Sequence, residues 1–184
     1  LKEIYPATDR RIYAIYEALR KGHSVDKIHD LSKIDNWFLW QIEKIFKIEK
    51  TLKTSTKLEY DLMLEAKRNG FSDYVIAKLV NSDEQKVRAK RISLGIKPVF
   101  KQIDTLAGEY DAETNYLYST YHGNVNDITP LKKKSIIVIG SGPYSIGSSV
   151  EFDWSAVNTA KTLQKNGYKT IIVNSNPETV STDY

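Results

Sequence analysis

The sequence predicts a mostly α-helical fold, in which a helical bundle built from a duplicated helix-turn-helix unit is followed by an incomplete strand–helix–strand (βαβ) segment. Apolar residues recur every three or four positions from residue 9 to about residue 95, the spacing of helices that bury one face. Beyond residue 134, two short runs of branched apolar residues flank a further helical pattern, which is typical of a parallel α/β sheet. We therefore expect a helical domain at 1–95, a connector at 96–133 and the beginning of an α/β domain at 134–184.

The helical part contains an internal repeat at a shift of 48 residues. Each copy predicts a helix closed by a glycine, a short helix capped by a serine and a longer helix capped by an aspartate, so six helices are expected. Asp9, Ser24, Asp35, Ser72 and Ser82 are the candidate helix-start residues, and Ser82 with Gln85 matches a capping box. The repeat rests on eight identities: Glu17, Ala18, Arg20, Gly22, Ser24, Ile28, Leu31 and Asp35 fall on Glu65, Ala66, Arg68, Gly70, Ser72, Ile76, Leu79 and Asp83.

The third helix of the second copy raises the possibility of nucleic-acid binding, because Arg88, Lys90 and Arg91 resemble the cations of a DNA-reading helix. The alternative is simple packing, in which Val87, Ile92 and Leu94 are buried and the cations face water. The matching stretch of the first copy, "NWFLWQIEKIF", is apolar and aromatic, which favours packing. Acidic residues are also interspersed among the basic ones, so no nucleic-acid partner is expected.

Three large aromatic residues, Trp37, Phe38 and Trp40, form a candidate interface. They either belong to the core or make an apolar patch that a partner covers. Three such residues within four positions cannot all face one side of a helix, so at least one is expected to point away from the core.

The connector is expected to form short strands at "PVFKQI" and "NYLYSTY", which are rich in β-branched and aromatic residues. His122 has no second histidine at metal-ligand spacing, so a structural or solvated role is predicted and no metal site is expected. Four tyrosines should lie across a neighbouring surface with their rings buried: Tyr110, Tyr116, Tyr118 and Tyr121.

Gly140, Gly142 and Gly147 form a glycine-rich turn between a predicted strand and a predicted helix. The dinucleotide-binding fingerprint fails here, because Ser145 stands at its third glycine and the second strand ends in Asn174 without an acid. A Walker loop fits from Gly142 but has Ser148 where its lysine is required. The kinase loop also fails, because no downstream catalytic segment follows. The glycines are therefore predicted to shape a loop, and its backbone amides could bind an anion only weakly. Glu151 and Asp153, near the start of the next helix, are predicted to cap it.

Two parallel strands and one helix bury little surface. Residues 135–184 are therefore expected to be poorly ordered, to lean on the helical half or to pair with another copy.

Composition excludes several classes of function. The 184 residues include 41% apolar residues, enough for a packed core, and carry a formal net charge of +4. No cysteine is present, which excludes disulfides, thiolate metal sites and cysteine nucleophiles. No apolar stretch approaches the length of a membrane span, and the beginning of the chain lacks the pattern of a signal peptide, so a cytoplasmic location is expected.

The motifs "GSGPYSIGSSVEFDW" and "NSNPETVSTDY" resemble the start of the second synthetase half of the carbamoyl-phosphate synthase large subunit family. The helical half is similar to the oligomerisation domain of that family at "IDNWFLWQI", "GFSDYVIAKL" and "YSTY". Ser148 departs from the glutamine that is commoner in bacteria. The resemblance implies that the βαβ segment begins a pre-ATP-grasp domain and that the chain is an internal piece of a longer polypeptide.

The family makes carbamoyl phosphate from bicarbonate, two ATP and ammonia that a small glutamine-amidotransferase subunit supplies, for arginine and pyrimidine synthesis. Its ATP, Mg²⁺ (or Mn²⁺) and K⁺ are held by ATP-grasp domains outside these residues. The resemblance thus implies a noncatalytic piece of an ATP-dependent ligase with no cofactor of its own, which self-associates through its helical domain. By motif position, Tyr144, Ile146 and Ser149 would wall the internal passage for carbamate.

Parts of the sequence also resemble two other classes of protein. A redox-sensing transcription factor would join a helix-turn-helix unit to a dinucleotide-binding fold, but the late glycine and the missing acid weigh against it. A stand-alone nucleotide enzyme would need a histidine, lysine or carboxylate pair near the glycine turn, and none is placed convincingly.

Overall fold

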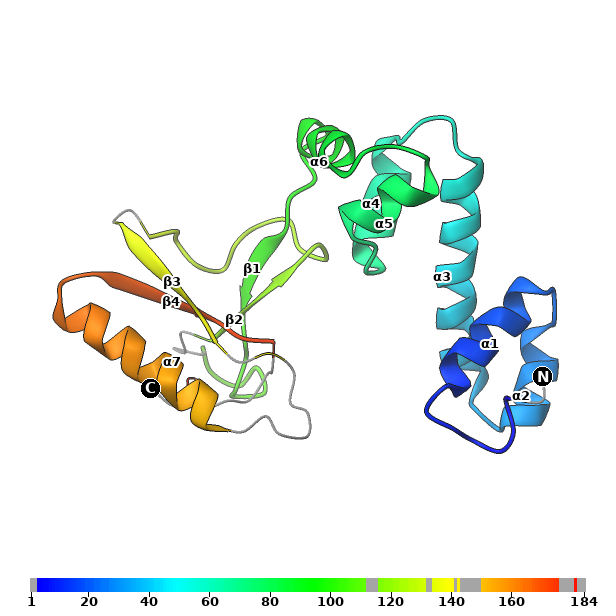
Figure 1. Cartoon of the computed structure of the whole chain (residues 1–184), viewed down its shortest axis with the longest axis horizontal. Helices are drawn as coiled ribbons and strands as arrows, with labels where there is room; N and C mark the ends of the chain where they lie inside the picture. Colours follow the sequence, from blue (N-terminus) through cyan, green and yellow to red (C-terminus); the bar gives the residue numbers. More distant parts are fainter. Residues whose placement is uncertain are drawn as a thin grey trace. The chain divides into compact units, whose positions relative to one another are not determined.

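The computed structural model of the chain describes residues 3–111, 116–131, 134–140, 142, 150–175 and 181 (Figure 1). The chain divides into two compact units. The helical unit comprises residues 1–99 and 119–125, and the α/β unit comprises residues 100–118 and 126–184. Within the described residues, no helix has both the length and the apolar character that a membrane crossing requires.

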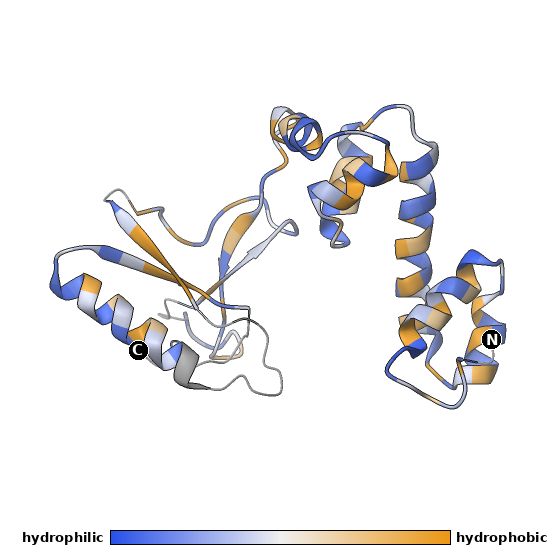
Figure 2. Ribbon diagram, in the orientation of Figure 1, coloured by the Kyte–Doolittle hydropathy of each residue, from blue (hydrophilic) through white to orange (hydrophobic). Residues whose placement is uncertain are grey.

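The described part of the helical unit contains six helices, as predicted. They run in chain order as α1 (Arg11–Arg20), α2 (Val25–Ser32), α3 (Asn36–Thr54), α4 (Tyr60–Arg68), α5 (Asp73–Leu79) and α6 (Glu84–Ser93). Each carries both hydrophobic and hydrophilic residues along its length, as surface helices with one buried face do (Figure 2).

The repeat is confirmed in the backbone, because equivalent residues of the two copies take the same conformation. Gly22 and Gly70 close α1 and α4 with φ of 84° and 87°, the left-handed region that glycine adopts without strain. Ser24 accepts from the Lys27 N–H at 3.3 Å and Ser72 from the Val75 N–H at 3.1 Å, so both predicted serine caps are present.

Two predicted caps are wrong by one residue. Asp83, not the capping-box residue Ser82, is the N-cap of α6 and accepts from the N–H groups of Gln85 and Lys86, which confirms the aspartate cap that the repeat predicts. The side chains of Ser82 and Asp83 can both accept such bonds, so the capping-box pattern did not separate them. Arg10, not Asp9, is the N-cap of α1, and it makes no side-chain cap bond.

Helix α3, the third helix of the first copy, packs in the cores of both copies of the repeat. Its Leu39 packs in the first core, where α1 and α2 contribute Ile15 and Ile28. Farther along, Ile48 and Leu52 pack in the second core with buried residues of α4, α5 and α6, namely Met63, Ala66, Ile76, Ala77 and Val87. The two helical cores are thus tied together by one continuous helix.

The second copy contains a buried ion network where the first copy is apolar. Asp73 accepts from Arg91 Nε and Nη2 at 2.8–3.0 Å and from Lys67 Nζ at 2.9 Å. At the shift of 48 residues, Lys67 and Asp73 correspond to Leu19 and Val25, which are both in the first core. Burial alone would raise the pKa of the Asp73 carboxyl. Hydrogen bonds from Arg91 and Lys67, together with their charges, outweigh burial and hold that pKa below its ordinary value.

The connector forms a two-stranded sheet from β1 (Val99–Gln102) and β2 (Leu117–Thr120), as its composition predicted. After β2 the chain docks on the helical unit. Tyr121 packs against the second core, its carbonyl accepts from Arg68 Nε at 3.2 Å, and its ring lies 5.2 Å from Lys67 Nζ. The expectation of four buried rings is wrong, because Tyr110 and Tyr118 are exposed.

The α/β unit contains β3 (Ser135–Ile139), α7 (Val150–Lys165) and β4 (Lys169–Val173), the predicted strand–helix–strand order. The strands pair in parallel, with Ile137 opposite Ile171. Helix α7 covers one face of this sheet (Figure 1), where Ala156 and Ala160 pack with Val138. On the other face the apolar side chains of both strands are exposed: Ile137, Ile139, Ile171 and Val173.

Replacing Asp73 with alanine should lower the free energy of unfolding by about 3 to 5 kcal/mol, because Arg91 and Lys67 would be left buried without their counter-charge. Since the folded pKa of Asp73 is lowered, its contribution is complete above ~pH 4, the pKa of an unfolded aspartate, and is lost as pH falls through the folded value. Denaturant unfolding between pH 7 and pH 2 measures both effects, and the gap between wild type and variant should shrink toward pH 2.

The triple variant Lys67→Leu/Asp73→Val/Arg91→Met is the control, since it gives positions 67 and 73 apolar side chains as in the first copy and replaces the Arg91 cation, which corresponds to Glu43, with an apolar side chain. It should recover most of the loss, because a well-packed apolar cluster can replace a buried ion network at little cost. An Asp73→Ala protein as stable as wild type at pH 7 would contradict this account of the network.

Candidate functional sites

The glycine turn begins at Gly140, where the chain passes very close to Asn174. The Gly140 N–H donates to the Val173 carbonyl at 2.9 Å, which extends the pairing of β3 and β4 by one residue. A Cβ atom at Gly140 would lie 1.8 Å from Asn174 Oδ1, a distance that no side chain can tolerate. A Cβ at Gly142 would meet nothing within 4 Å. The close approach at residue 140 therefore gives a physical reason for glycine there, and packing gives none at 142.

The remaining residues predicted at this turn lie outside the described residues. These are the loop-shaping Gly147 and the candidates for the passage wall, Tyr144, Ile146 and Ser149.

Asp153 is the centre of a buried polar cluster that the sequence did not reveal. It is fully buried, and its Oδ1 accepts from Asn174 Nδ2 at 2.9 Å. Its Oδ2 accepts from the Ser181 N–H at 2.6 Å, while Asn174 Nδ2 also donates to Ser181 Oγ at 2.6 Å. The predicted capping role is wrong for Asp153, because α7 begins at Val150 and the carboxylate bonds to the segment after β4. The side chain of Glu151 lies outside the described residues.

A periodicity signal could have identified Asp153 as buried. It stands four residues before Val157 and seven before Ala160, so the three share one face of α7, and all three are buried. A carboxylate on that face must be matched by hydrogen-bond donors, because burying an unpaired charge is costly.

The geometry gives Asp153 a positioning role at the carboxyl ends of β3 and β4. Both of its oxygens accept hydrogen bonds from the chain itself, so it joins α7 to the segment that follows β4. Ligands of open α/β sheets bind at this edge. Across the described part of the chain, no group of three histidine, aspartate or glutamate side chains could hold a metal ion.

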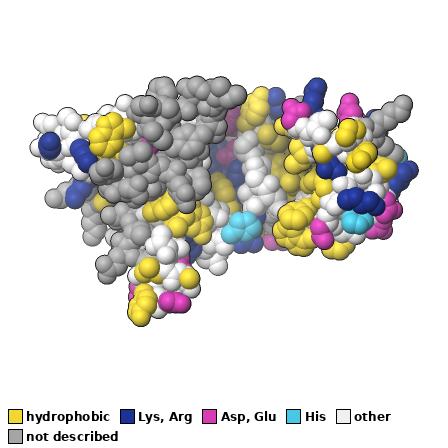
Figure 3. Space-filling view, turned by 90° about the horizontal axis from the view of Figure 1, so that it is seen from below, with side chains coloured by type: hydrophobic (Ala, Val, Ile, Leu, Met, Phe, Trp, Pro, Cys, Tyr) yellow, Lys and Arg dark blue, Asp and Glu magenta, His cyan; other side chains and the backbone are white. Residues whose placement is uncertain are grey.

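Trp37, Phe38 and Trp40, called here the aromatic face, lie at the start of α3. Their side chains are 55%, 58% and 52% exposed, so none belongs to the core, and Leu39 fills the core position between them. The Trp37 and Phe38 rings meet edge to face with centroids 5.0 Å apart. Hydrophobic side chains gather over the helical unit on the surface seen in Figure 3. An exposed cluster of this kind is suited to a protein partner.

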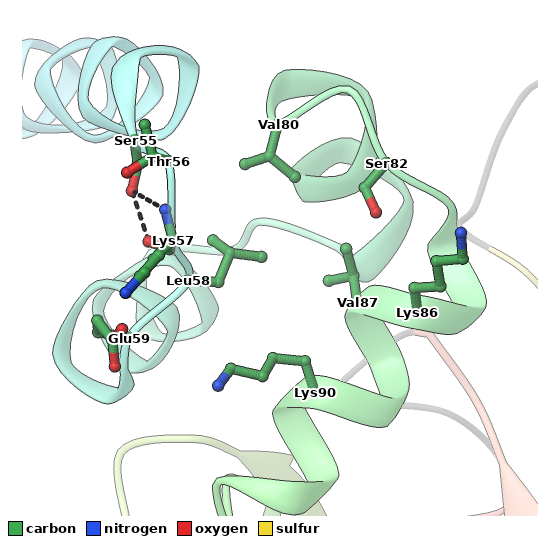
Figure 4. A pocket seen from close by; sticks show the side chains of 10 residues that line it. All are labelled: Ser55, Thr56, Lys57, Leu58, Glu59, Val80, Ser82, Lys86, Val87 and Lys90. Atoms are coloured by element: carbon green, nitrogen blue, oxygen red, sulfur yellow. Dashed lines mark hydrogen bonds between the residues drawn. The ribbon is translucent and has the colours of Figure 1, made fainter.

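A groove lies between the turn that precedes α4, the turn that joins α5 to α6, and helix α6 (Figure 4). We call it the basic groove. Leu58, Val80 and Val87 contribute apolar side chains, and Lys57, Lys86 and Lys90 contribute positive charge. The other residues that line it are Ser55, Thr56, Glu59 and Ser82.

Helix α6 does not present the cations of a DNA-reading helix as a group. Arg91 is buried in the ion pair with Asp73, whereas Arg88 and Lys90 are exposed. Val87 is buried as the packing alternative predicted, but Ile92 is exposed.

His122 has structural contacts, as predicted. Its Nε2 lies 3.0 Å from the Arg68 carbonyl, and its backbone N–H donates to Thr120 Oγ1 at 3.1 Å. Together with Tyr121 it fixes the end of the connector to α4.

Comparison with known proteins gives consistent matches over both units. Residues 1–95 match the family model described as "Carbamoyl-phosphate synthetase large chain, oligomerisation domain", and residues 132–184 match that of the "Carbamoyl phosphate synthase preATP-grasp domain". The chain is 51% identical over 181 residues to the mitochondrial arginine-specific carbamoyl phosphate synthase large chain of Schizosaccharomyces pombe. It is 49% identical over 178 residues to the arginine-specific large chain of Bacillus subtilis. These matches cover 96% of this chain in each case but only 16% and 17% of the relatives.

Replacing Gly140 with alanine should destabilise the α/β unit by about 1 to 3 kcal/mol, because the new methyl group would displace Asn174 and remove one of the donors to the buried Asp153 carboxylate. Hydrogen exchange of the β3 and β4 amides measures the effect. Gly142→Ala is the matched control and should leave their protection unchanged, since open space surrounds that position. Equal protection in the two variants would show that the Asn174 contact does not constrain residue 140.

Proposed function

Because the chain belongs to the family of carbamoyl-phosphate synthetase large-chain oligomerisation domains, we propose that it is a noncatalytic assembly segment of a longer carbamoyl-phosphate synthase large chain. The observation that carries the proposal is the match over residues 1–95 in a unit that exposes three large aromatic side chains. The chain spans about one sixth of the length of the relatives named above. The activity proposed for the longer protein is therefore the ATP-dependent ligase reaction that makes carbamoyl phosphate.

We propose that the helical unit self-associates through the aromatic face. Trp37, Phe38 and Trp40 stand together on the first turn of a long helix, and α3 is anchored in two cores, so the face is presented on a rigid support. Tryptophan and other aromatic residues are enriched among the side chains that contribute most to protein interfaces.

We propose that the α/β unit contributes part of the passage for carbamate. Tyr144, Ile146 and Ser149 would form its wall, and Gly140, Gly142 and Gly147 would shape the loop that carries them. The Asp153 cluster supports this role, because it fixes α7, which follows the loop, against Asn174 at the end of β4.

The longer protein is proposed to hold ATP, Mg²⁺ or Mn²⁺, and K⁺ outside these residues, and to receive ammonia from a small glutamine-amidotransferase subunit. A role in arginine synthesis is supported by the names of the arginine-specific relatives. Another relative, 45% identical over 186 residues, is the multifunctional protein pyr1-3 of Dictyostelium discoideum. The cytoplasmic location stays a prediction, since one relative is a mitochondrial protein of a fungus and the other is a bacterial protein. A redox-sensing transcription factor is not supported by these matches.

Sedimentation of the 184-residue chain over a range of concentrations tests the assembly role. The wild type should self-associate. Trp37→Lys/Trp40→Lys should weaken the association constant by about tenfold or more, because two exposed rings would be replaced by cations. Tyr74→Lys is the control: Tyr74 is also half exposed on the helical unit but lies outside the aromatic face.

The same double variant in the full-length synthase should lower the assembly state while ATP-dependent carbamoyl phosphate formation continues in the separated molecules. A loss of synthesis that is proportionate to the loss of assembly would contradict a noncatalytic role. A wild-type chain that stays monomeric at every concentration would contradict the proposal as a whole.

A further inference from the structure

We propose that the aromatic face of one molecule docks in the basic groove of a second copy of the chain. The inference rests on the proposed self-association and names the surface that receives the aromatic side chains. It is carried by two observations: the chemistry of the groove and the state of its lysines.

The two copies of the helical repeat share one scaffold but present opposite chemistry at equivalent positions of their third helices. At the shift of 48 residues, Leu39 of α3 corresponds to Val87 of α6, and both are buried. Around this shared anchor, Phe38 corresponds to Lys86 and Ile42 to Lys90. At these two positions the first copy is apolar where the second copy is cationic, whereas Trp37 and Trp40 correspond to Gln85 and Arg88, which do not line the groove.

The basic groove suits a bound aromatic ring in shape and polarity. It has a volume of about 390 Å³, within the range of pockets that take ligands of several rings. Leu58, Val80 and Val87 project toward one another across it, and the side chain of Lys90 extends along its edge (Figure 4). Val87 is buried, so a docked ring would lie against the half-buried Leu58 and Val80 and would be flanked by lysine.

The lysines of the groove can engage ring faces. An ammonium group over the face of an aromatic ring is attracted by the ring quadrupole, and tryptophan gives the strongest contact of this kind. No ion pair between described residues includes Lys57, Lys86 or Lys90, whereas Lys47 and Lys53 on α3 are paired with Glu43 and Glu49. The groove lysines therefore keep their charge available for a partner.

The groove also offers acceptors for the polar edge of an indole. A buried tryptophan needs an acceptor for its ring N–H. The Glu59 carboxylate and the Ser82 hydroxyl both line the groove and can accept such a bond.

The contact joins unlike surfaces, which makes it testable by complementation. Each chain carries one aromatic face and one basic groove, so a chain that lacks the face keeps a usable groove, and a chain that lacks the groove keeps a usable face. A contact between two aromatic faces would not have this property.

The experiment compares three variants of the 184-residue chain by sedimentation at equal concentration, with circular dichroism to verify folding. The face variant is Trp37→Lys/Trp40→Lys, and the groove variant is Lys86→Glu/Lys90→Glu. Arg88→Glu is the control, because it makes the same charge change on α6 at an exposed residue that does not line the groove. Each double variant alone should weaken self-association at least tenfold, and Arg88→Glu should not.

Mixing the face variant with the groove variant should restore a complex, detected with a fluorescent label on one of the two. The intact face then meets the intact groove, and in a two-fold pair the new lysines also meet the new glutamates.

Wild-type-like association of the groove variant, or no complex in the mixture, would overturn the inference and leave self-association through the aromatic face standing. A monomeric wild type would overturn both proposals.

Discussion

The length of α3 is the constraint on which the helical unit depends. Its 19 residues span about 28 Å at 1.5 Å per residue, which is enough to enter two cores that lie one after the other along it. Leu39 fills the first core and Leu52 the second, so each copy of the repeat completes its apolar packing with a different part of one helix. The helix has a third side that neither core covers near its start, and Trp37 and Trp40 are exposed there.

Duplication explains how one scaffold came to carry two different surfaces and two different interiors. Backbone features that depend on local chemistry are shared, such as the positive φ of Lys33 and Asn81, which follow the second helix of each copy. Features that depend on contacts between helices have diverged, because Lys67 and Asp73 replace an apolar pair. Asp73 holds Arg91 in the interior. The guanidinium carbon of Arg91 lies 5.9 Å from the centre of the Tyr121 ring. The second copy can therefore hold the end of the connector, where Lys67 and Arg91 both face that ring.

Most of the fold could be predicted from the sequence, because the decisive signals are local. The helical period, the glycine stops and the serine caps of α2 and α5 each act within a few residues and lie where predicted, whereas the predicted cap at Ser82 is wrong. The ion network of Asp73 could not be predicted, since its partner Arg91 is 18 residues away and either residue reads as a solvated charge. For the same reason Asp153 was mistaken for a cap, because its partners stand 21 and 28 residues later. The exposure of all three aromatics also depends on which helices pack together, and a pattern within one helix does not contain that information.

The Asp153 cluster also explains why the glycine turn departs from a dinucleotide site. Such a site needs an acid at the end of the second strand, and Asn174 stands there. Asn174 donates to the buried Asp153 carboxylate, a bond that a second carboxylate could not supply without placing two like charges within hydrogen-bond distance. Position 174 therefore cannot both donate to Asp153, which ties β4 to α7, and hold the acid that would bind a ribose hydroxyl. Gly140, Asp153, Asn174 and Ser181 come from three separate stretches of the sequence, and their contacts hold the ends of β3 and β4 together and tie β4 to α7.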